Sequence, residues 1–238
     1  MLRSISLQTV KPTQVLIADD GSDTQTRNIV KRFARELPII IIWQPNRGFR
    51  AARSRNIALL KITGDYTIFI DGDCMLPPHF VEMHLKIAEP QKLIAGSRAL
   101  LSEGETSELK AKQDQNSVIR SFQSIKFWRI PLGPIRNLFP KDWRTVRTCN
   151  MAAHTADIIQ IAGFDENYIG WGREDSDFVV RLLRSGITIK SARFAACVNH
   201  LYHAESDRSR LSANHLRFES LLNRSTLNPK FKSLLKEL

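Results

Sequence analysis

The sequence predicts an α/β protein with a mostly parallel sheet that is covered by helices on both faces. Between residues 14 and 88, short apolar segments of strand length alternate with segments of helical periodicity. The apolar segments are continuous, which is typical of strands buried on both sides. Two of them run into acidic turns. Because parallel sheets bind ligands just beyond the carboxyl ends of their strands, these turns are candidate functional groups.

The first predicted strand covers residues 14–17 and stops at the turn Asp19-Asp20-Gly21-Ser22. A helix follows it, with Asp23 or Thr24 as the N-cap. Four apolar residues fall on one face of that helix: Ile29, Val30, Phe33 and Leu37. Pro38 ends the helix, because proline cannot continue its hydrogen-bond ladder.

The second strand is the apolar run at residues 39–43, and a turn at 45–48 leads into a helix from about residue 49 to 62. Gly64 closes that helix. The third strand, residues 66–70, runs into Asp71-Gly72-Asp73 and is followed by a helix around residues 79–88. Strands joined by helices in this way pair in parallel.

The bulk composition fits one folded domain. With 238 residues, of which 42% are hydrophobic, the chain can close a core. Its formal net charge of +11 favours an anionic partner, which is nucleic acid, anionic lipid or a phosphorylated substrate. No apolar stretch approaches the roughly 18 residues that span a bilayer. Cys74, Cys149 and Cys197 lie far apart and lack the spacing of a zinc or redox site, which favours a reducing, cytoplasmic compartment.

Residues 110–147 combine many basic residues with Phe122, Phe127, Trp128, Phe139 and Trp143. One interpretation is an irregular lobe, whose aromatic side chains pack inward while its charges are solvated. The other is a basic, aromatic surface for anionic lipid or a lipid-linked acceptor. We favour the irregular lobe, because the segment shows no clear single-face periodicity.

Two carboxylates separated by one glycine follow the third strand, at Asp71 and Asp73. Such a pair offers oxygen ligands to Mg²⁺ or Mn²⁺, which proteins hold with a few carboxylates together with substrate phosphates. Asp and Gly are also the commonest turn residues. Taken alone, the triplet therefore favours a simple acidic turn.

A second acidic cluster shifts this balance towards function. The motif Gly163-Phe164-Asp165-Glu166 precedes a glycine-rich segment with Trp171, Glu174 and Asp175. Helical spacing resumes downstream, so Glu174 and Asp175 lie near a helix start, where the helix dipole favours negative charge. A carboxylate placed there can accept a proton from a sugar hydroxyl. Helix capping explains one or two of the acids, but it does not explain the tryptophan, which can stack on a sugar ring.

The segment Asn199-His200-Leu201-Tyr202-His203 follows an apolar run and supplies two further candidates. A lone histidine is more often a satisfied core or surface residue than a metal ligand. If the strand continues through this segment, its period of two places His200 and His203 on opposite faces, and only one of them can reach a metal. We favour His203, at the strand end.

With these motifs the chain resembles the family 2 glycosyltransferases of the GT-A fold, with a galactosyltransferase-like C-terminal half as in bacterial chondroitin polymerases and animal β-1,4-galactosyltransferases. The resemblance runs from about Gln8 to His203. Its motifs are residues 15–22, Asn46-Arg47-Gly48 with Arg55-Asn56, Asp71-Gly72-Asp73, and residues 163–166 with 171–175. It implies one GT-A domain with three parts: a nucleotide-sugar-binding half at 1–104, the basic aromatic lobe at 105–148, and an acceptor-binding half with C-terminal helices at 149–238.

On the donor side, the resemblance implies a UDP-sugar. Asp20, together with Asp19, would contact the uracil, and Arg55 would lie near the nucleotide. Asp71 would face the ribose or the metal.

At the reaction centre, the resemblance implies that Asp73 and His203 hold Mn²⁺ or Mg²⁺. Trp171 and Glu174 would hold the acceptor sugar, which is a glycan or a lipid-linked glycan. Asp175 would deprotonate its hydroxyl for a single in-line displacement with inversion. The product would be a bacterial cell-surface glycan such as lipopolysaccharide or capsule, made in the cytoplasm with a peripheral contact at the inner face of the cytoplasmic membrane.

Members of this family begin with an additional valine- and isoleucine-rich strand, followed by Pro-Thr-Tyr-Asn. This chain starts inside the next helix, at about residues 2–9. We therefore expect that the first strand is missing and that the chain is N-terminally truncated. Its loss should expose backbone donors and apolar side chains in the sheet. The family resemblance therefore does not by itself predict that these residues alone catalyse the transfer.

Three other functions compete with the transferase. A basic nucleic-acid-binding protein fits the charge, but carboxylates at the strand ends would repel phosphates, so we expect no nucleic-acid partner. A nucleotidyl transferase predicts a glycine-rich loop near the start, which the sequence lacks. A non-catalytic domain that binds sugar or nucleotide fits the missing strand.

Overall fold

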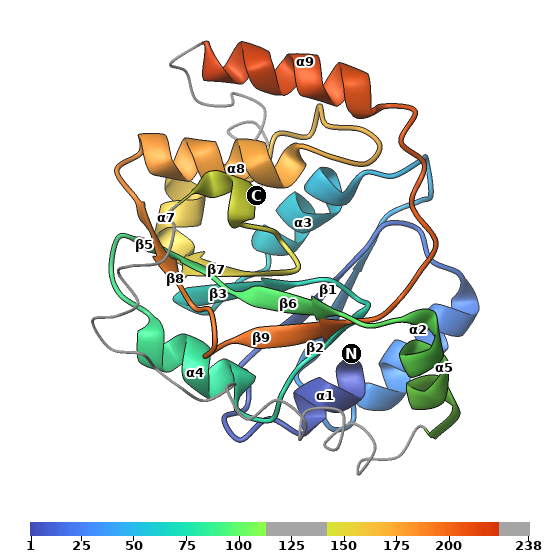
Figure 1. Cartoon of the computed structure of the whole chain (residues 1–238). Coiled ribbons are helices and arrows are strands. Elements are labelled where there is room, and N and C mark those ends of the chain that lie inside the picture. The colour runs from blue at the N-terminus through green and yellow to red at the C-terminus, as the bar shows by residue number, and fades with distance from the viewer. Residues whose placement is uncertain (113–141, 224–238) are drawn as a thin grey trace. The chain divides into compact units, whose positions relative to one another are not determined.

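The computed structural model describes residues 1–112 and 142–223 (Figure 1). The chain forms two compact units, each assembled from three separate stretches. The first unit comprises Met1–Pro12, Tyr66–Ala153 and Thr188–Ala204, and the second comprises Thr13–Asp65, His154–Ile187 and the chain from Glu205 onwards. Both units combine helices with strands, so the predicted α/β class is confirmed.

The second unit contains a two-stranded sheet. Strand β1 (Val15–Asp19) pairs in parallel with β2 (Ile39–Trp43) along its whole length. Helix α2 (Thr24–Phe33) joins the two strands, and the Asp23 carboxylate caps it by accepting a hydrogen bond of 2.8 Å from the Thr26 amide. Helix α3 (Ala51–Leu59) packs against both strands.

Three more helices belong to the second unit: α7 (Thr155–Gln160), α8 (Glu174–Arg184) and α9 (Leu211–Leu222). Helices α8 and α9 pack against each other and lie side by side in Figure 1. Helix α8 is buried along most of its length, since residues 176–182 are all buried, and its Phe178 ring stacks on Phe164 with the ring centroids 4.2 Å apart. This packing fixes the position of the charged residues at the start of α8.

The first unit contains two sheets, with strand orders β3-β7-β5-β8 and β4-β9-β6. The β5–β8 and β6–β9 pairs are parallel, whereas β5–β7 and β4–β9 are antiparallel. Its elements are α1 (Leu2–Ser6), β3 (Tyr66–Ile70), β4 (Cys74–Met75), α4 (Phe80–Ile87), β5 (Lys92–Ala95), β6 (Ser97–Leu100), α5 (Glu103–Lys112), the short helix η2 (Trp143–Thr145), β7 (Asn150–His154), β8 (Thr188–Ser191) and β9 (Cys197–His200).

A buried polar group ties three elements of the first unit together. His84 on α4 is fully buried, and its Nε2 lies 3.0 Å from the Asn150 side-chain oxygen. The Asn150 amide donates to the carbonyls of Ser97 and Ala196. Because burial disfavours a charged imidazole, the pKa of His84 falls to about 4.

The structure differs from the sequence prediction in the pairing of the strands. The parallel β1–β2 pair forms a sheet of its own within the described residues, and the sheets of the first unit are mixed. Some of these strands lack the continuous apolar run that signals a buried parallel strand. Strand β4 has only two residues, and β7 has a polar residue at each end, Asn150 and His154. Helix α3 is also shorter than the predicted 49–62.

Several predictions fall outside what the structure describes. The basic aromatic segment lies largely on residues 113–141, so both interpretations of it stay predictions, as do the boundaries at 104 and 148. Across the described stretches 1–112 and 142–223, no helix has the length and apolarity needed to cross a bilayer. The thiols of Cys74, Cys149 and Cys197 are free.

Candidate active site

The turn after β3 brings Asp73 next to two histidines. The Cys74 amide donates to the Asp71 carbonyl at 3.1 Å, and the Leu201 amide donates to the Asp73 carbonyl at 3.0 Å. The second bond holds this turn against the end of β9. As a result the Asp73 carboxylate lies 3.5 Å from Nε2 of His200 and 3.3 Å from Nε2 of His203.

Backbone carbonyls fix the orientation of both imidazoles. Nδ1 of His200 lies 3.0 Å from the Leu201 carbonyl, and Nδ1 of His203 lies 2.7 Å from the Ala204 carbonyl. Because a carbonyl only accepts hydrogen bonds, each Nδ1 carries the proton. With Nδ1 bound in this way, the Nε2 atoms of both rings are directed towards the Asp73 carboxylate, and metal-binding histidines are commonly held by such a contact at the other ring nitrogen.

The structure brings both histidines to Asp73, whereas the sequence predicted that only one of them would reach it if the strand continued. The prediction depended on a strand that continues to His203, but β9 ends at His200. The chain turns after that residue, and both rings face the same carboxylate. Among the residues described, Asp73, His200 and His203 form a cluster whose ligand atoms all lie within 4.8 Å of one another.

The chemistry of this cluster fits a divalent cation. Two imidazole nitrogens and one carboxylate lie within 4.8 Å of one another, and nitrogen and oxygen ligands of these kinds suit a divalent cation. The Asp73 carboxylate is one-third exposed, so substrate phosphates can complete the coordination. Asp71 is partly buried in the same turn.

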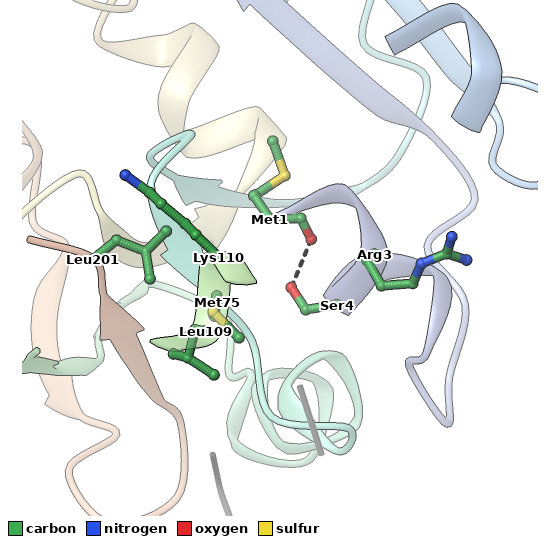
Figure 2. A pocket seen from close by; sticks show the side chains of 7 residues that line it. All are labelled: Met1, Arg3, Ser4, Met75, Leu109, Lys110 and Leu201. Atoms are coloured by element: carbon green, nitrogen blue, oxygen red, sulfur yellow. Dashed lines mark hydrogen bonds between the residues drawn. The ribbon is translucent and has the colours of Figure 1, made fainter. Parts of the chain in front are cut away.

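A small cavity of about 90 Å³ is lined by residues that neighbour this cluster in the sequence (Figure 2). Met75 follows the acidic turn by two residues, and Leu201 lies between the two histidines. The walls are mainly apolar, with two basic residues among them. The lining residues are Met1, Arg3, Ser4, Met75, Leu109, Lys110 and Leu201.

The acidic turn after β1 belongs to the second unit and is held from within. The buried Asp19 carboxylate accepts hydrogen bonds from the amides of Gly21 (3.1 Å) and Ser22 (2.7 Å). Asp20 accepts from the Gln44 side chain at 2.6 Å and from the Arg50 amide. The sequence analysis missed the roles of Gln44 and Arg50, because their contacts with Asp20 span 24 and 30 residues.

The start of α8 gathers the second set of predicted residues. Buried Glu174 is the first residue of this helix, and its carboxylate lies 3.3 Å from the Arg55 guanidinium. Burial and the neighbouring Asp175 raise the pKa of Glu174, while Arg55 opposes that shift. Arg55, which the resemblance placed near the nucleotide, thus pairs with a predicted acceptor-site residue.

Asp175 is half-buried at the same helix start. One of its carboxylate oxygens accepts a hydrogen bond of 2.7 Å from the Ser176 amide. The first turn of a helix favours a negative charge at this position. The side chain therefore combines charge with access to solvent, which a general base needs.

Trp171 precedes this helix in a segment shaped by two glycines with positive φ, Gly170 and Gly172. Its ring is 39% exposed, and the Arg208 guanidinium lies 4.9 Å from the ring centroid. An exposed indole that precedes Glu174 by three residues and Asp175 by four is suited to a sugar ring.

The other acids of this region have structural roles. Asp177 and Arg181 form a buried ion pair at 2.5 Å. Asp165 pairs with Arg217 at 2.7 Å, and Glu166 pairs with Arg53 at 3.1 Å. The sequence could not separate these acids from Asp175, because their partners are distant or on the next turn of the helix.

Comparison with protein families gives two matches. The model of glycosyl transferase family 2 matches residues 1–159, and a model described as the N-terminal domain of galactosyltransferase matches residues 136–204. These matches bear out the resemblance drawn from the motifs, including its galactosyltransferase-like C-terminal half.

Two curated proteins show the range of relatives. A validoxylamine A glucosyltransferase from Streptomyces hygroscopicus subsp. limoneus is 25% identical over 210 residues, which are 81% of this chain and 46% of that protein. A chondroitin synthase from Escherichia coli is 25% identical over 218 residues, which are 83% of this chain and 31% of that protein. The chain thus spans less than half the length of these relatives.

Solved structures confirm the GT-A fold. S. aureus TarS in complex with UDP-GlcNAc matches with a TM-score of 0.64 and 14% identity, over 98% of this chain and 64% of that one. The mannosyltransferase PcManGT from Pyrobaculum calidifontis, in complex with GDP-Man and Mn²⁺, matches with a TM-score of 0.59 and 18% identity, over 99% of this chain and 63% of that one. At such identities the likeness concerns the fold alone.

Proposed function

Because this chain belongs to glycosyl transferase family 2, we propose that it moves a sugar from a UDP-sugar to a glycan hydroxyl, with inversion at the sugar carbon. The observation that carries the proposal is the convergence of Asp73, His200 and His203 at the end of a strand. Structural neighbours bound to UDP-GlcNAc and to GDP-Man with Mn²⁺ support the donor class and the cation.

Asp73, His203 and His200 would hold the cation. Two imidazole nitrogens favour a transition-metal ion such as Mn²⁺ over Mg²⁺, which is held by oxygen ligands and water. When bound, the ion would stabilise the negative charge that the departing UDP acquires. Asp71 would face the ribose or the metal.

The uracil would lie against the turn of Asp19 and Asp20, whose fixed hydrogen bonds keep its shape. Arg55 would act on the acceptor side by neutralising and orienting Glu174, in addition to the nucleotide contact that the resemblance implies. The first assignment comes from the resemblance, and the ion pair between Arg55 and Glu174 supports the second.

The acceptor sugar would stack on Trp171 and donate a hydrogen bond to Glu174. Asp175 would take the proton of the attacking hydroxyl. The hydroxyl oxygen then bonds to the anomeric carbon while the bond from that carbon to the phosphate oxygen breaks, and UDP leaves with the electron pair. Because a single displacement occurs, the configuration of the carbon inverts.

The product would be a cell-surface glycan, and the enzyme would work at the inner face of the cytoplasmic membrane. The similarity to a chondroitin synthase, which by its name makes a polysaccharide, supports this class of product. The net charge of +11 supports contact with anionic lipid or with a lipid-linked phosphate.

Calorimetric UDP binding with and without Mn²⁺, followed by a transfer assay over a panel of UDP-sugars, tests the proposal. Asp73→Asn should weaken Mn²⁺-dependent UDP binding by at least about tenfold. Asp175→Asn should leave UDP binding intact and lower transfer by about a hundredfold or more. Asp65→Asn makes the same change at an exposed position outside both clusters and should behave as wild type.

Two results would contradict the proposal. UDP binding that does not depend on the metal would remove the role of Asp73, and UDP binding without transfer of any sugar would favour the non-catalytic domain.

A further inference from the structure

Helix α9, which lies beyond the motifs and beyond the residues that the family models match, contacts the segment that carries Trp171. Asn214 lies on its buried face and is 4% exposed. Its side-chain amide donates to the carbonyl of Ile169 at 3.2 Å and to that of Trp171 at 3.4 Å. One side chain therefore holds the backbone on both sides of Gly170.

Two glycines show how closely this helix approaches. Gly170 and Gly172 have φ values of 79° and 104°. A Cβ at Gly170 would lie 2.7 Å from Cβ of Arg210, and one at Gly172 would lie 2.9 Å from Cδ1 of Leu211. Both positions need glycine for conformation and for space. The Gly-Trp-Gly pattern is thus explained by the contact with α9.

Charged groups attach α9 at several points. Arg217 binds the Asp165 carboxylate through Nε at 2.8 Å and through Nη2 at 2.7 Å. At the other end of the helix, Arg184 of α8 donates to the carbonyls of Leu221 and Leu222, where a cation is favourable. The helix is therefore a fixed support.

We propose that α9 determines how the acceptor is held, and that Asn214 is the positioning residue through which it acts. The proposal rests on the proposed function, in which Trp171 stacks on the acceptor sugar. A glycine-flanked segment samples many conformations on its own. Two hydrogen bonds from a packed helix select one of them, and the adjacent Arg208 guanidinium covers one side of the indole ring.

Hydrogen exchange tests whether Asn214 orders the segment that carries Trp171, and this measurement needs no acceptor. In Asn214→Ala, amides of residues 166–172 should exchange about tenfold faster than in the wild type, while those of residues 178–184 in α8 keep their rates. Ser212→Ala, on the exposed face of the same helix, is the matched control and should change neither set. Unchanged exchange at 166–172 in Asn214→Ala would overturn the proposal.

Steady-state kinetics test the functional part. Asn214→Ala should raise the KM for the glycan acceptor by about fivefold to twentyfold, with kcat and the KM for the UDP-sugar within about twofold of wild type. Asn214→Asp keeps the shape but loses the donor, so it should be at least as impaired. Wild-type kinetics in Asn214→Asp, or an equal loss for donor and acceptor, would overturn the positioning role.

A failure of the proposed function has a different signature. If the wild-type chain transfers no sugar to any acceptor, the transferase assignment fails, while the exchange rates still decide whether Asn214 holds residues 169–172. If Asn214→Ala does not fold, Arg217→Met replaces it in the same comparison, since Arg217 lies on the exposed side of α9.

Discussion

At the scale of single residues, the two histidines illustrate how local backbone contacts prepare a site. In each ring, Nδ1 donates a hydrogen bond to the carbonyl of the next residue in the chain. The rings therefore need no rotation before a cation arrives. Ligands ordered in advance lose little conformational freedom on binding.

We therefore expect both histidines to contribute to cation affinity. His200→Ala and His203→Ala should each weaken Mn²⁺ binding by about tenfold or more, measured by electron paramagnetic resonance of free Mn²⁺ in a titration. His215→Ala is the control, because this exposed imidazole lies beside Glu219 on α9. Wild-type affinity in His200→Ala would leave His203 as the histidine ligand, as the sequence suggested.

The buried His84 should make stability depend on pH. Its folded pKa of about 4 lies below the value of 6.5 for a free imidazole, so the unfolded chain binds more protons between these values. Stability is therefore lost as the pH falls through 6.5 towards 4. The free energy of unfolding should drop by about 2 kcal/mol between pH 7 and about pH 5 from this group.

Urea unfolding at the two pH values measures this effect. His84→Gln has no titrating imidazole and should lose about 2 kcal/mol less than the wild type over the same interval. Equal losses in the two proteins would show that other groups cause the pH dependence.

At the scale of helices and strands, the sequence predicted what local patterns determine. The apolar runs at residues 39–43 and 66–70 became β2 and β3, and Asp23 capped α2. Glu174 marked the start of α8 because acids collect in the first turn of a helix. Each of these signals depends on neighbours within one or two turns.

Contacts between distant residues could not be predicted in this way. The meeting of Asp73 with both histidines depends on where β9 ends, and the pairing of Arg55 with Glu174 spans 119 residues. The role of Asn214 depends on carbonyls 43 and 45 residues away. No periodicity within either segment reports such a distance.

The ion pair inside α8 should be essential to this helix. Asp177 and Arg181 are each 3% exposed, and Arg181 also donates to the Ile161 carbonyl at 2.8 Å. Burial raises the pKa of Asp177, and the Arg181 charge opposes that shift. Arg181→Met would leave a buried carboxylate beside the Tyr168 hydroxyl.

We expect Arg181→Met to lower the free energy of unfolding by about 3–5 kcal/mol, measured by urea titration. Adding Asp177→Asn to the same chain should recover part of this loss, because the uncompensated charge is removed. Lys31→Met, at an exposed position on α2, should change stability by less than about 0.5 kcal/mol. A mild effect of Arg181→Met alone would mean that water reaches Asp177.

At the scale of the whole molecule, the net charge of +11 predicts weak binding to any polyanion. Affinity for single-stranded DNA, measured by fluorescence anisotropy, should therefore fall by at least about a hundredfold between about 50 mM and about 200 mM salt. Mn²⁺-dependent UDP binding should change far less, because it depends on the fixed ligands of the cluster. DNA binding that survives the higher salt would favour the nucleic-acid-binding alternative.

The interleaving of the two compact units also bears on how the protein is made. Each unit is built from stretches that lie early and late in the sequence. For example, the Asn56 side chain forms two hydrogen bonds with the backbone of Phe164, which lies 108 residues further along the chain. A nascent chain leaving the ribosome therefore cannot finish either unit before most of the polypeptide has emerged. Loop closures of this length slow folding, so the exposed early segments should be natural clients for chaperones during synthesis.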